Sequence, residues 1–181
     1  RASIHDLADS LATLMVEMQS EGVTADDIRA LDVTDMSGHW ARAQQFIGIV
    51  ETYLGARPQP DAQARQRLVA EALISHWRDS PPEHPVVLAG STGSRGTTLM
   101  LLAAIARLPQ GAVILPGYDF DQPEHVWKDM DNALVSEDHP QFRFSNVLRA
   151  LDMGPGDVQR WTDAPPPSPA RNALVSLALR P

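Results

Sequence analysis

The sequence predicts an α/β protein in which a helical N-terminal subdomain precedes a part with a short parallel sheet. Two observations lead to this fold class. Through residues 1–80, apolar residues recur at the three- and four-residue spacing of amphipathic helices. Farther on, two short apolar runs at 86–89 and 112–115 have the length of buried strands, and a helix-length apolar segment separates them. We therefore expect a helical subdomain at 1–80 and an α/β portion at 81–181.

The first two helices carry sequence signals at their ends. Ser3 with Asp6, and Thr24 with Asp27, have the spacing of a capping box, in which two side chains satisfy backbone N–H groups at a helix start. Gly22 is expected to end the first helix, because glycine readily adopts the left-handed conformation found there.

Two longer helices are expected next, one from near Ser37 to Gly55 and one from near Asp61 to the prolines at 81–82. The stretch 57–60 between them is a linker containing two prolines. Apolar stripes run along these helices, and we expect each stripe to pack against other helices rather than to bind a cofactor. The stripes include Leu11, Met15, Met18, Trp40, Phe46, Ile47, Val50, Tyr53, Leu68, Val69, Leu73 and Trp77.

A strand–helix–strand unit is expected in the α/β portion. Residues 86–89 form the first strand, an apolar helix follows from about Leu99 to Leu108, and residues 112–115 form the second strand. Such a unit of about thirty residues places the two strands parallel, with a right-handed crossover. Both strands are expected to be buried.

The C-terminal part is less regular. We expect a helix after Pro123 that reaches Leu134, another that Ser145 caps, and a short third strand at 158–161. A proline-rich connector at 164–169 then leads to a last helix at 170–179.

A glycine-rich loop at 90–98 is the strongest candidate for a binding site. Glycines between a strand and a helix can turn backbone N–H groups toward a phosphate. The phosphate-loop signature is absent, however, because Thr97 follows Gly96 where lysine is required. The other interpretation is a tight turn in which Thr97 or Ser94 caps the next helix. If the loop binds a nucleotide, the residues involved are Gly90, Ser91, Thr92 and Gly93.

Two aspartates follow the second strand. Asp119 and Asp121 stand where parallel sheets place metal or nucleotide ligands, and together they could contact Mg²⁺. The alternative is a polar turn, which we favour because aspartate is a common turn residue. Asp119 stays a candidate for cofactor binding.

Composition narrows the functions further. The formal net charge is -8 and Lys128 is the only lysine, so the chain alone should bind DNA weakly or not at all. It contains no cysteine, and its six histidines show no metal-ligand spacing, so we expect no metal site and no catalytic residues. No apolar run could span a bilayer, and a cytoplasmic protein is expected. Because the chain begins with Arg1, we expect an internal fragment of a longer protein.

Several segments in collinear order resemble the AddB family of the alphaproteobacterial type. The run at 101–119 is the most specific of them. The segments are LADSLA at 7–12, EMQSEG at 17–22, PVVLAGSTGS at 85–94, LLAAIARLPQGAVILPGYD at 101–119 and HPQF at 139–142.

The resemblance implies a subunit of a bacterial helicase–nuclease. AddB pairs with the motor subunit AddA in an ATP-dependent helicase–exonuclease that processes DNA double-strand breaks for recombinational repair. The whole complex would use ATP, Mg²⁺ and an iron–sulfur cluster that lies outside this segment. On this basis residues 1–80 resemble an accessory (1B-like) subdomain, and residues 81–181 resemble part of a RecA-like domain of the P-loop superfamily.

The resemblance also implies that this segment is not catalytic. Active relatives end the first strand in an Asp-Glu pair that holds Mg²⁺, whereas Ala89, Gly90 and Ser91 stand here. In active relatives the following strand ends in Gly-Asp and then a glutamine that senses the γ-phosphate. Gly117, Asp119 and Gln122 match this only in part, with displaced spacing, so the resemblance implies no ATPase role for them. Two other functions stay open. One is a stand-alone nucleotide-binding α/β protein using the loop at 90–98, and the other is a helical interaction module unrelated to DNA. The strand–helix–strand unit is also expected to leave a sheet edge exposed, through which the isolated segment should dimerise or aggregate.

Overall fold

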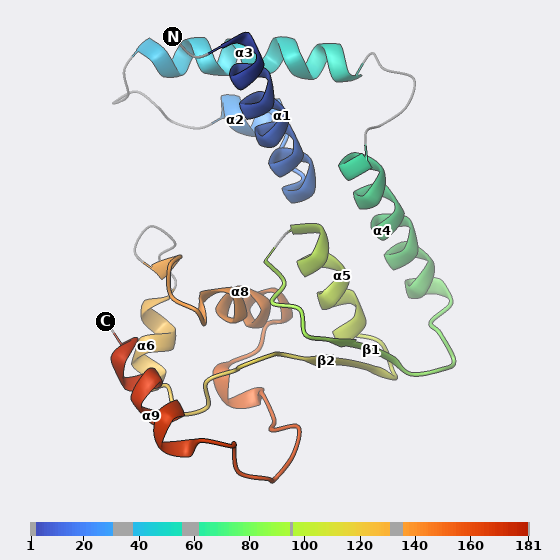
Figure 1. Cartoon of the computed structure of the whole chain (residues 1–181). Helices are drawn as coiled ribbons and strands as arrows, with labels where there is room; N and C mark the ends of the chain where they lie inside the picture. The colour runs from blue at the N-terminus through green and yellow to red at the C-terminus, as the bar shows by residue number, and fades with distance from the viewer. Residues whose placement is uncertain (1–2, 31–37, 56–61, 95, 131–135, 181) are drawn as a thin grey trace. The chain divides into compact units, whose positions relative to one another are not determined.

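The computed structural model describes residues 3–30, 38–55, 62–94, 96–130 and 136–180. These residues are mostly helical, with one short parallel sheet of two strands (Figure 1), as expected of the α/β class. The chain forms two compact units. The first contains Arg1–His76 with Arg95–Thr97, and the second contains Trp77–Ser94 with Thr98–Pro181.

Four helices make up most of the first unit. They are α1 (Ile4–Glu21), α2 (Ala25–Arg29), α3 (Gly38–Gly55) and α4 (Ala62–Asp79), the last of which continues into the second unit. The predicted helix starts at Ser37 and Asp61 and the linker at 57–60 lie outside the described residues.

Both capping boxes form as predicted. The Ser3 hydroxyl oxygen accepts a hydrogen bond from the N–H of Asp6 (3.1 Å), whose carboxylate accepts one from the N–H of Ser3 (2.9 Å). Thr24 and Asp27 repeat this arrangement at 3.2 and 2.8 Å. These hydrogen bonds lower the pKa of both carboxyl groups, because they stabilise the charged form. Gly22 ends α1 with φ 72°, the left-handed conformation expected there.

The core of the first unit is small. Its buried cluster consists of Met15, Met18 and Ile47, against which partly buried side chains of α1, α2 and α3 pack. Polar contacts support it, since the Gln44 side-chain amide donates to the carbonyl of Ile28 at 2.8 Å.

The sheet of the second unit has the predicted strand–helix–strand connection. Strand β1 (Val86–Ala89) pairs in parallel with β2 (Gly111–Ile114), with Val86 opposite Gly111 and Ala89 opposite Ile114. Helix α5 (Gly96–Ala106) connects them and lies along one face of the strands (Figure 1). A Cβ atom at Gly111 would collide with the carbonyl oxygen of Ile105, so the close approach of α5 to β2 requires glycine.

The prediction that both strands are buried is wrong: all four residues of β2 are only half-buried, and β1 is more exposed still. Val87 is 55% exposed and Ala89 is also exposed, whereas Val86 and Leu88 are half-buried. A run of apolar residues indicates burial on both faces only when helices cover both faces of the sheet. Here the face that carries Val87 is left open.

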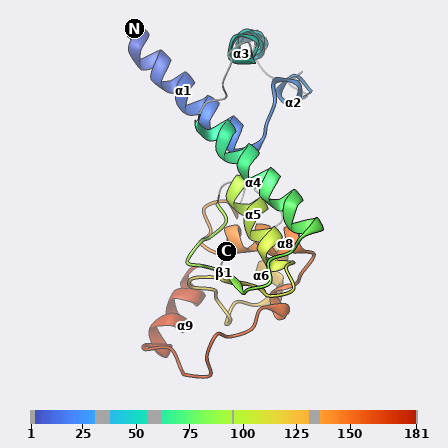
Figure 2. The ribbon, with the colours of Figure 1, turned by 90° about the vertical axis from the view of Figure 1, so that its right-hand side faces the viewer.

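Among the described residues, three more helices and a short 3₁₀ helix follow the sheet. They are α6 (Glu124–Asp129), α8 (Phe142–Leu151), the 3₁₀ helix η1 (Pro155–Asp157) and α9 (Pro169–Ala178). The predicted helices after Pro123 and at 170–179 form, but the first ends at Asp129, before Met130, and does not continue as predicted; Leu134 lies outside the described residues. Figure 2 shows the long connection between η1 and α9 at the bottom of the view.

Three local predictions are wrong. Ser145 lies inside α8 and Thr97 inside α5, so neither residue caps its helix. Residues 158–161 form no strand. They follow η1, in which the Asp157 carboxylate accepts a hydrogen bond from the N–H of Gly154 (2.7 Å). Trp161 is 77% exposed, so it has none of the burial that a third strand would provide.

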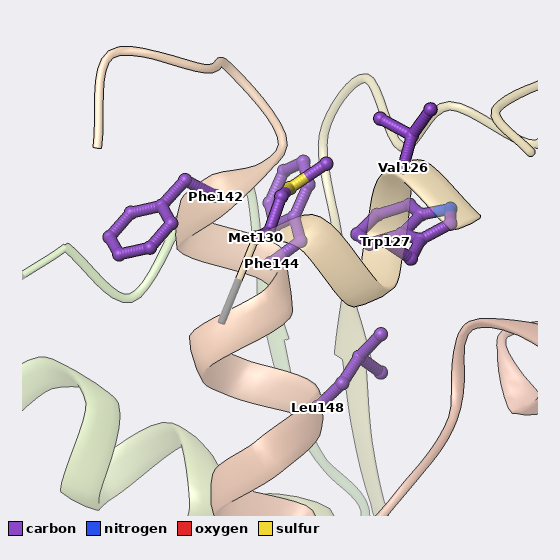
Figure 3. Packing of buried hydrophobic residues seen from close by; sticks show 6 residues of the cluster. All are labelled: Val126, Trp127, Met130, Phe142, Phe144 and Leu148. Carbon is purple, nitrogen blue, oxygen red and sulfur yellow. The ribbon is translucent and has the colours of Figure 1, made fainter. Parts of the chain in front are cut away.

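The main core of the second unit lies between α6 and α8. Figure 3 shows the six side chains of this cluster, which come from α6, α8 and Met130 just after α6. The buried members are Val126, Trp127, Met130, Phe142, Phe144 and Leu148. Leu115, Tyr118 and Val158 pack against this cluster, which joins the end of β2 to the helices.

Candidate functional site

The glycine-rich loop begins directly at the end of β1. Gly90 has φ 78° and Gly93 has φ 65°, conformations that glycine adopts without strain. The N–H of Gly90 donates to the carbonyl of Ile114 at 3.2 Å, which continues the pairing of the two strands. The N–H of Gly93 donates to the hydroxyl oxygen of Ser91 at 3.2 Å. Two of the amides that a phosphate would need are therefore already engaged within the protein.

Gly93 is held between two helices. It is buried, and a Cβ atom there would lie 3.0 Å from Val147 and 3.5 Å from Leu102. Glycine is required at this position both by its positive φ and by the closeness of α5 and α8. Thr92 beside it is exposed. The loop has the features of a packed strand-to-helix turn.

The end of β1 offers no ligand for a metal. Ala89 is exposed, Gly90 has no side chain, and the Ser91 hydroxyl accepts the hydrogen bond from Gly93. Neutral groups of this kind cannot replace the carboxylates that hold Mg²⁺ in a motor ATPase. Among the described residues, no group of three or more His, Cys, Asp or Glu side chains could hold a metal ion.

Asp119 lies in a turn after β2, which agrees with the turn interpretation. Its Oδ1 accepts a hydrogen bond from the N–H of Asp121 at 2.9 Å, the usual geometry of an aspartate turn. Its N–H donates to Oε1 of Gln141 at 3.0 Å, and Nε2 of Gln141 donates to the carbonyl of Gly117, also at 3.0 Å. The turn does not cap α6, which begins after Pro123 without a side-chain cap.

Tyr118 anchors the same turn. Its ring stacks on Trp127 at 5.1 Å between ring centres, and its hydroxyl donates to the carbonyl of Pro155 at 2.9 Å. Burial, with a smaller contribution from the charge of Asp119, raises the pKa of Tyr118 to about 12. The phenol is thus protonated at neutral pH and serves as a hydrogen-bond donor within the structure.

A large cavity of about 1150 Å³ lies beside the turn in the second unit. Asp119 lines it together with residues of β2, α8 and α9, whereas the loop residues Gly90, Ser91, Thr92 and Gly93 do not. The structure therefore does not bring the predicted binding residues into one site. Gln122, the other echo of a motor motif, is buried, and neither polar atom of its side chain has a partner among the described residues.

The residues that organise this region were not singled out from the sequence. Gln141 is only 8% exposed and links two points of the turn, and Tyr118 connects the turn to η1 and α6. A buried glutamine leaves no periodic signal, because its role depends on partners more than twenty residues away. The HPQF segment at 139–142 was noted in the sequence only because it resembles part of a family.

No family model matches the chain, and neither the curated proteins nor the solved structures include a protein found to be similar to it. Among the described residues, no helix is long and apolar enough to cross a membrane.

Proposed function

We propose that this chain is a non-catalytic segment of an AddB-type subunit, with a structural role and a role in subunit contact. In this proposal it belongs to a helicase–exonuclease that processes DNA double-strand breaks for recombinational repair, and its partner is the motor subunit AddA. The observation that carries the non-catalytic role is the end of β1. Exposed Ala89, Gly90 and the internally bonded Ser91 stand where a working motor needs two carboxylates.

The loop after β1 supports the same proposal. A phosphate is bound by several N–H groups that converge on one point. The N–H groups of Gly90 and Gly93 are instead bonded to the carbonyl of Ile114 and the hydroxyl of Ser91. This arrangement disfavours a stand-alone nucleotide-binding protein that uses the loop.

The proposal places residues 81–181, with the proline-rich connector 164–169, in an inactivated RecA-like region. Residues 1–80 would be its accessory subdomain. The parallel crossover from β1 through α5 to β2 is compatible with such a region. Because the formal net charge is -8, we expect other parts of the complex to make most of the contacts with DNA.

A thermal titration with ATP and Mg²⁺ tests the non-catalytic part. A ligand that binds only the folded state raises the melting temperature as its concentration passes its dissociation constant. We expect no shift at millimolar ATP–Mg²⁺, with AddA as the positive control. A saturable upward shift would contradict the proposal and favour nucleotide binding.

The coding sequence around the segment tests the family assignment. A phosphate-loop motif upstream and a nuclease motif with cluster cysteines downstream are expected. Co-purification of tagged chain with AddA would then test the contact role directly. A stop codon immediately after Pro181, or absence of both motifs, would overturn the assignment.

A second candidate is a protein-interaction module unrelated to DNA. The exposed apolar side chains of α9 favour it, with Leu174 65% and Leu177 60% exposed. The flanking motifs distinguish the two candidates, because an interaction module requires neither of them.

A further inference from the structure

The end of α1 contacts the start of α5. The N–H of Gly96, the first residue of α5, donates to Oε1 of Glu21 at 2.8 Å. The hydroxyl of Thr97 donates to the carbonyl of Ser20, also at 2.8 Å. Gly96 and Thr97 belong to the first unit together with α1, whereas α5 from Thr98 onward belongs to the second unit. The first two residues of α5 are therefore supported by a different part of the chain from the rest of the helix.

The start of α5 takes its cap from this contact. The first N–H groups of a helix have no partner inside it, and a Ser, Thr, Asp or Asn side chain just before the helix usually accepts from one of them. Arg95 precedes α5 in the sequence, and an arginine side chain carries only donors. Glu21 supplies the acceptor from 75 residues earlier in the chain, and its negative charge suits the positive end of the helix dipole. The caps of α1 and α2, by contrast, act over three residues.

The contact is close and partly buried. A Cβ atom at Gly96 would lie 2.9 Å from Cα of Glu21, so a residue with a side chain there would force the two helix ends apart. Ser20 is 7% exposed and Thr97 is 9% exposed. Buried polar groups are costly to leave without a partner. The hydroxyl of Thr97 therefore strongly favours the position in which it reaches α1.

Arg67 of α4 holds the same end of α1. Its Nη1 donates to the carbonyl of Ser20 at 3.3 Å, and a Cβ atom at Gly22 would collide with its guanidinium group. The last carbonyls of a helix have no partner inside it, so that of Ser20 can accept from both Arg67 and Thr97. The end of α1 is thus fixed to α4 and supports Gly96 and Thr97 within the first unit.

The rest of α5 has its own support in the second unit. Leu102, Ala103 and Ile105 are at most 6% exposed. The carbonyl oxygen of Ile105 also lies so close to Gly111 of β2 that no side chain fits there. Proteins open locally where contacts are few, so a helix held by separate contacts at its two ends can lose one turn while the others stay formed. The first turn of α5 can therefore unwind without the rest.

We propose that the end of α1 is a latch for α5, made of Ser20 and Glu21 on α1 and of Gly96 and Thr97 on α5. While the latch is closed, the first turn of α5 is helical. When the end of α1 is released, this turn unwinds and joins the glycine-rich loop, and the later turns keep their place. The latch thus sets the length of the loop after β1 according to the state of α1. It rests on these contacts alone and does not depend on membership of a helicase–nuclease.

Removal of the carboxylate is the first test. In the whole chain, Glu21→Ala removes the acceptor of the Gly96 N–H and places a good helix former at the end of α1. Amide hydrogen exchange should become about tenfold faster or more at Gly96, and also at Met100, whose N–H bonds to the carbonyl of Gly96 while that turn is helical. Exchange at Ile105 should not change. The matched control is Glu17→Ala, which removes an exposed carboxylate one turn earlier in α1 and should leave all three amides unchanged.

A second pair of variants tests the buried hydrogen bond. Thr97→Val removes the hydroxyl that reaches Ser20, and Thr98→Val makes the same replacement one residue later, outside the latch. Both place valine in the same turn of α5, so the change in helix propensity is shared. We expect exchange at Met100 to be about tenfold faster in Thr97→Val and unchanged in Thr98→Val.

A change far from the latch tests whether α1 controls it. Ile47 on α3 belongs to the buried cluster with Met15 and Met18 of α1, and Ile47→Ala weakens this small core. Exchange at Met100 should then accelerate by about the same factor as exchange at the amides of α1, while Ile105 keeps its rate. If Ile47→Ala unfolds the first unit entirely, the expected pattern is fast exchange at Met100 with unchanged protection at Ile105.

Each comparison has an outcome that overturns the proposal. Faster exchange confined to Gly96 in Glu21→Ala would reduce the contact to an ordinary cap, and faster exchange that reaches Ile105 would show that α5 opens as one helix. Equal exchange at Met100 in both glutamate variants, or in both threonine variants, would show that the contact does not hold the turn. Unchanged exchange at Met100 in Ile47→Ala would show that α1 does not control it.

Discussion

The two units differ in what holds their helices in place. Among the described residues, the buried cluster of the first unit has three apolar side chains, whereas the main buried cluster of the second unit has six, including three aromatic rings. In the first unit, both capping boxes and the glycine stop act within a few residues of each helix end. In the second, the contacts of Gln141 and Tyr118 reach 22 to 37 residues along the chain. Short-range signals thus define the helices of the first unit, and long-range packing defines the second.

Helices of the first unit also leave apolar side chains exposed, as α9 of the second unit does. In the first unit Ile4, Ile49 and Val69 lie largely exposed on three different helices. A helix whose apolar stripe is not covered gains little from tertiary packing, so its caps matter more for its stability. The second unit should therefore respond most to changes in its core, and the first unit to changes at its helix ends.

The largest expected effect is the loss of a ring from the second core. Phe144 is 2% exposed, and Phe144→Ala should lower the free energy of unfolding by about 3–5 kcal/mol, because it leaves a cavity among rings that cannot close around it. Urea unfolding followed by tryptophan fluorescence measures this loss. The matched control is Phe46→Ala in α3, where the ring is 52% exposed and the loss should stay below about 1 kcal/mol. Equal losses would show that the first unit is packed as tightly as the second.

An intermediate effect is expected at Gln141. Gln141→Leu leaves the carbonyl of Gly117 and the N–H of Asp119 without their partner, which should cost about 2–3 kcal/mol. The control is Gln110→Leu, since the exposed Gln110 amide also makes a hydrogen bond of 3.0 Å, to the carbonyl of Glu83. Its loss should be about 0.5 kcal/mol because water can replace it. If urea unfolding finds the two losses equal, the buried polar link does not stabilise the second unit as described.

The smallest effect is expected at a helix cap of the first unit. Thr24→Ala removes the hydroxyl that caps α2 and should cost about 1 kcal/mol, whereas Thr52→Ala removes an exposed hydroxyl within α3 that bonds only to the carbonyl of Gly48. Amide hydrogen exchange at the start of α2 measures the change. Equal protection of that segment in both variants would contradict the importance of the cap.

The cap should also depend on pH. Its hydrogen bonds lower the pKa of Asp27 from the ordinary 3.8, so the carboxylate contributes stability above that value. This contribution is lost as the pH falls through the lowered pKa of the folded state. The difference between Thr24→Ala and the unaltered chain should therefore shrink under strongly acidic conditions.

Sequence patterns were sufficient where the cause of a structure is local. Ser3, Thr24 and Gly22 mark helix ends by chemistry that operates within one turn, and the apolar runs at 86–89 and 112–115 marked the strands to within one residue. They failed where the cause lies in another part of the chain. The exposure of Val87 depends on which sheet face α5 covers. The hydroxyl of Tyr118 donates to the carbonyl of Pro155, 37 residues along the chain, and no local pattern indicates that contact.

In the candidate site, too, only the features with a local cause could be predicted from the sequence. The glycines at 90 and 93 could be recognised as a turn, but whether their N–H groups were free for a ligand depended on Ile114 and Ser91. The cavity beside β2 could not be anticipated, because its walls come from segments separated by dozens of residues.

Gly93 has a consequence for how this sequence can evolve. Its backbone conformation and the nearness of Val147 both exclude a side chain, whereas Thr92 beside it is exposed. Descendant sequences should keep this glycine while the rest of the loop drifts. An alignment of such descendants would then display an invariant glycine after a strand, which resembles the mark of a nucleotide-binding ancestor. Selection for close packing alone would produce the same invariant position.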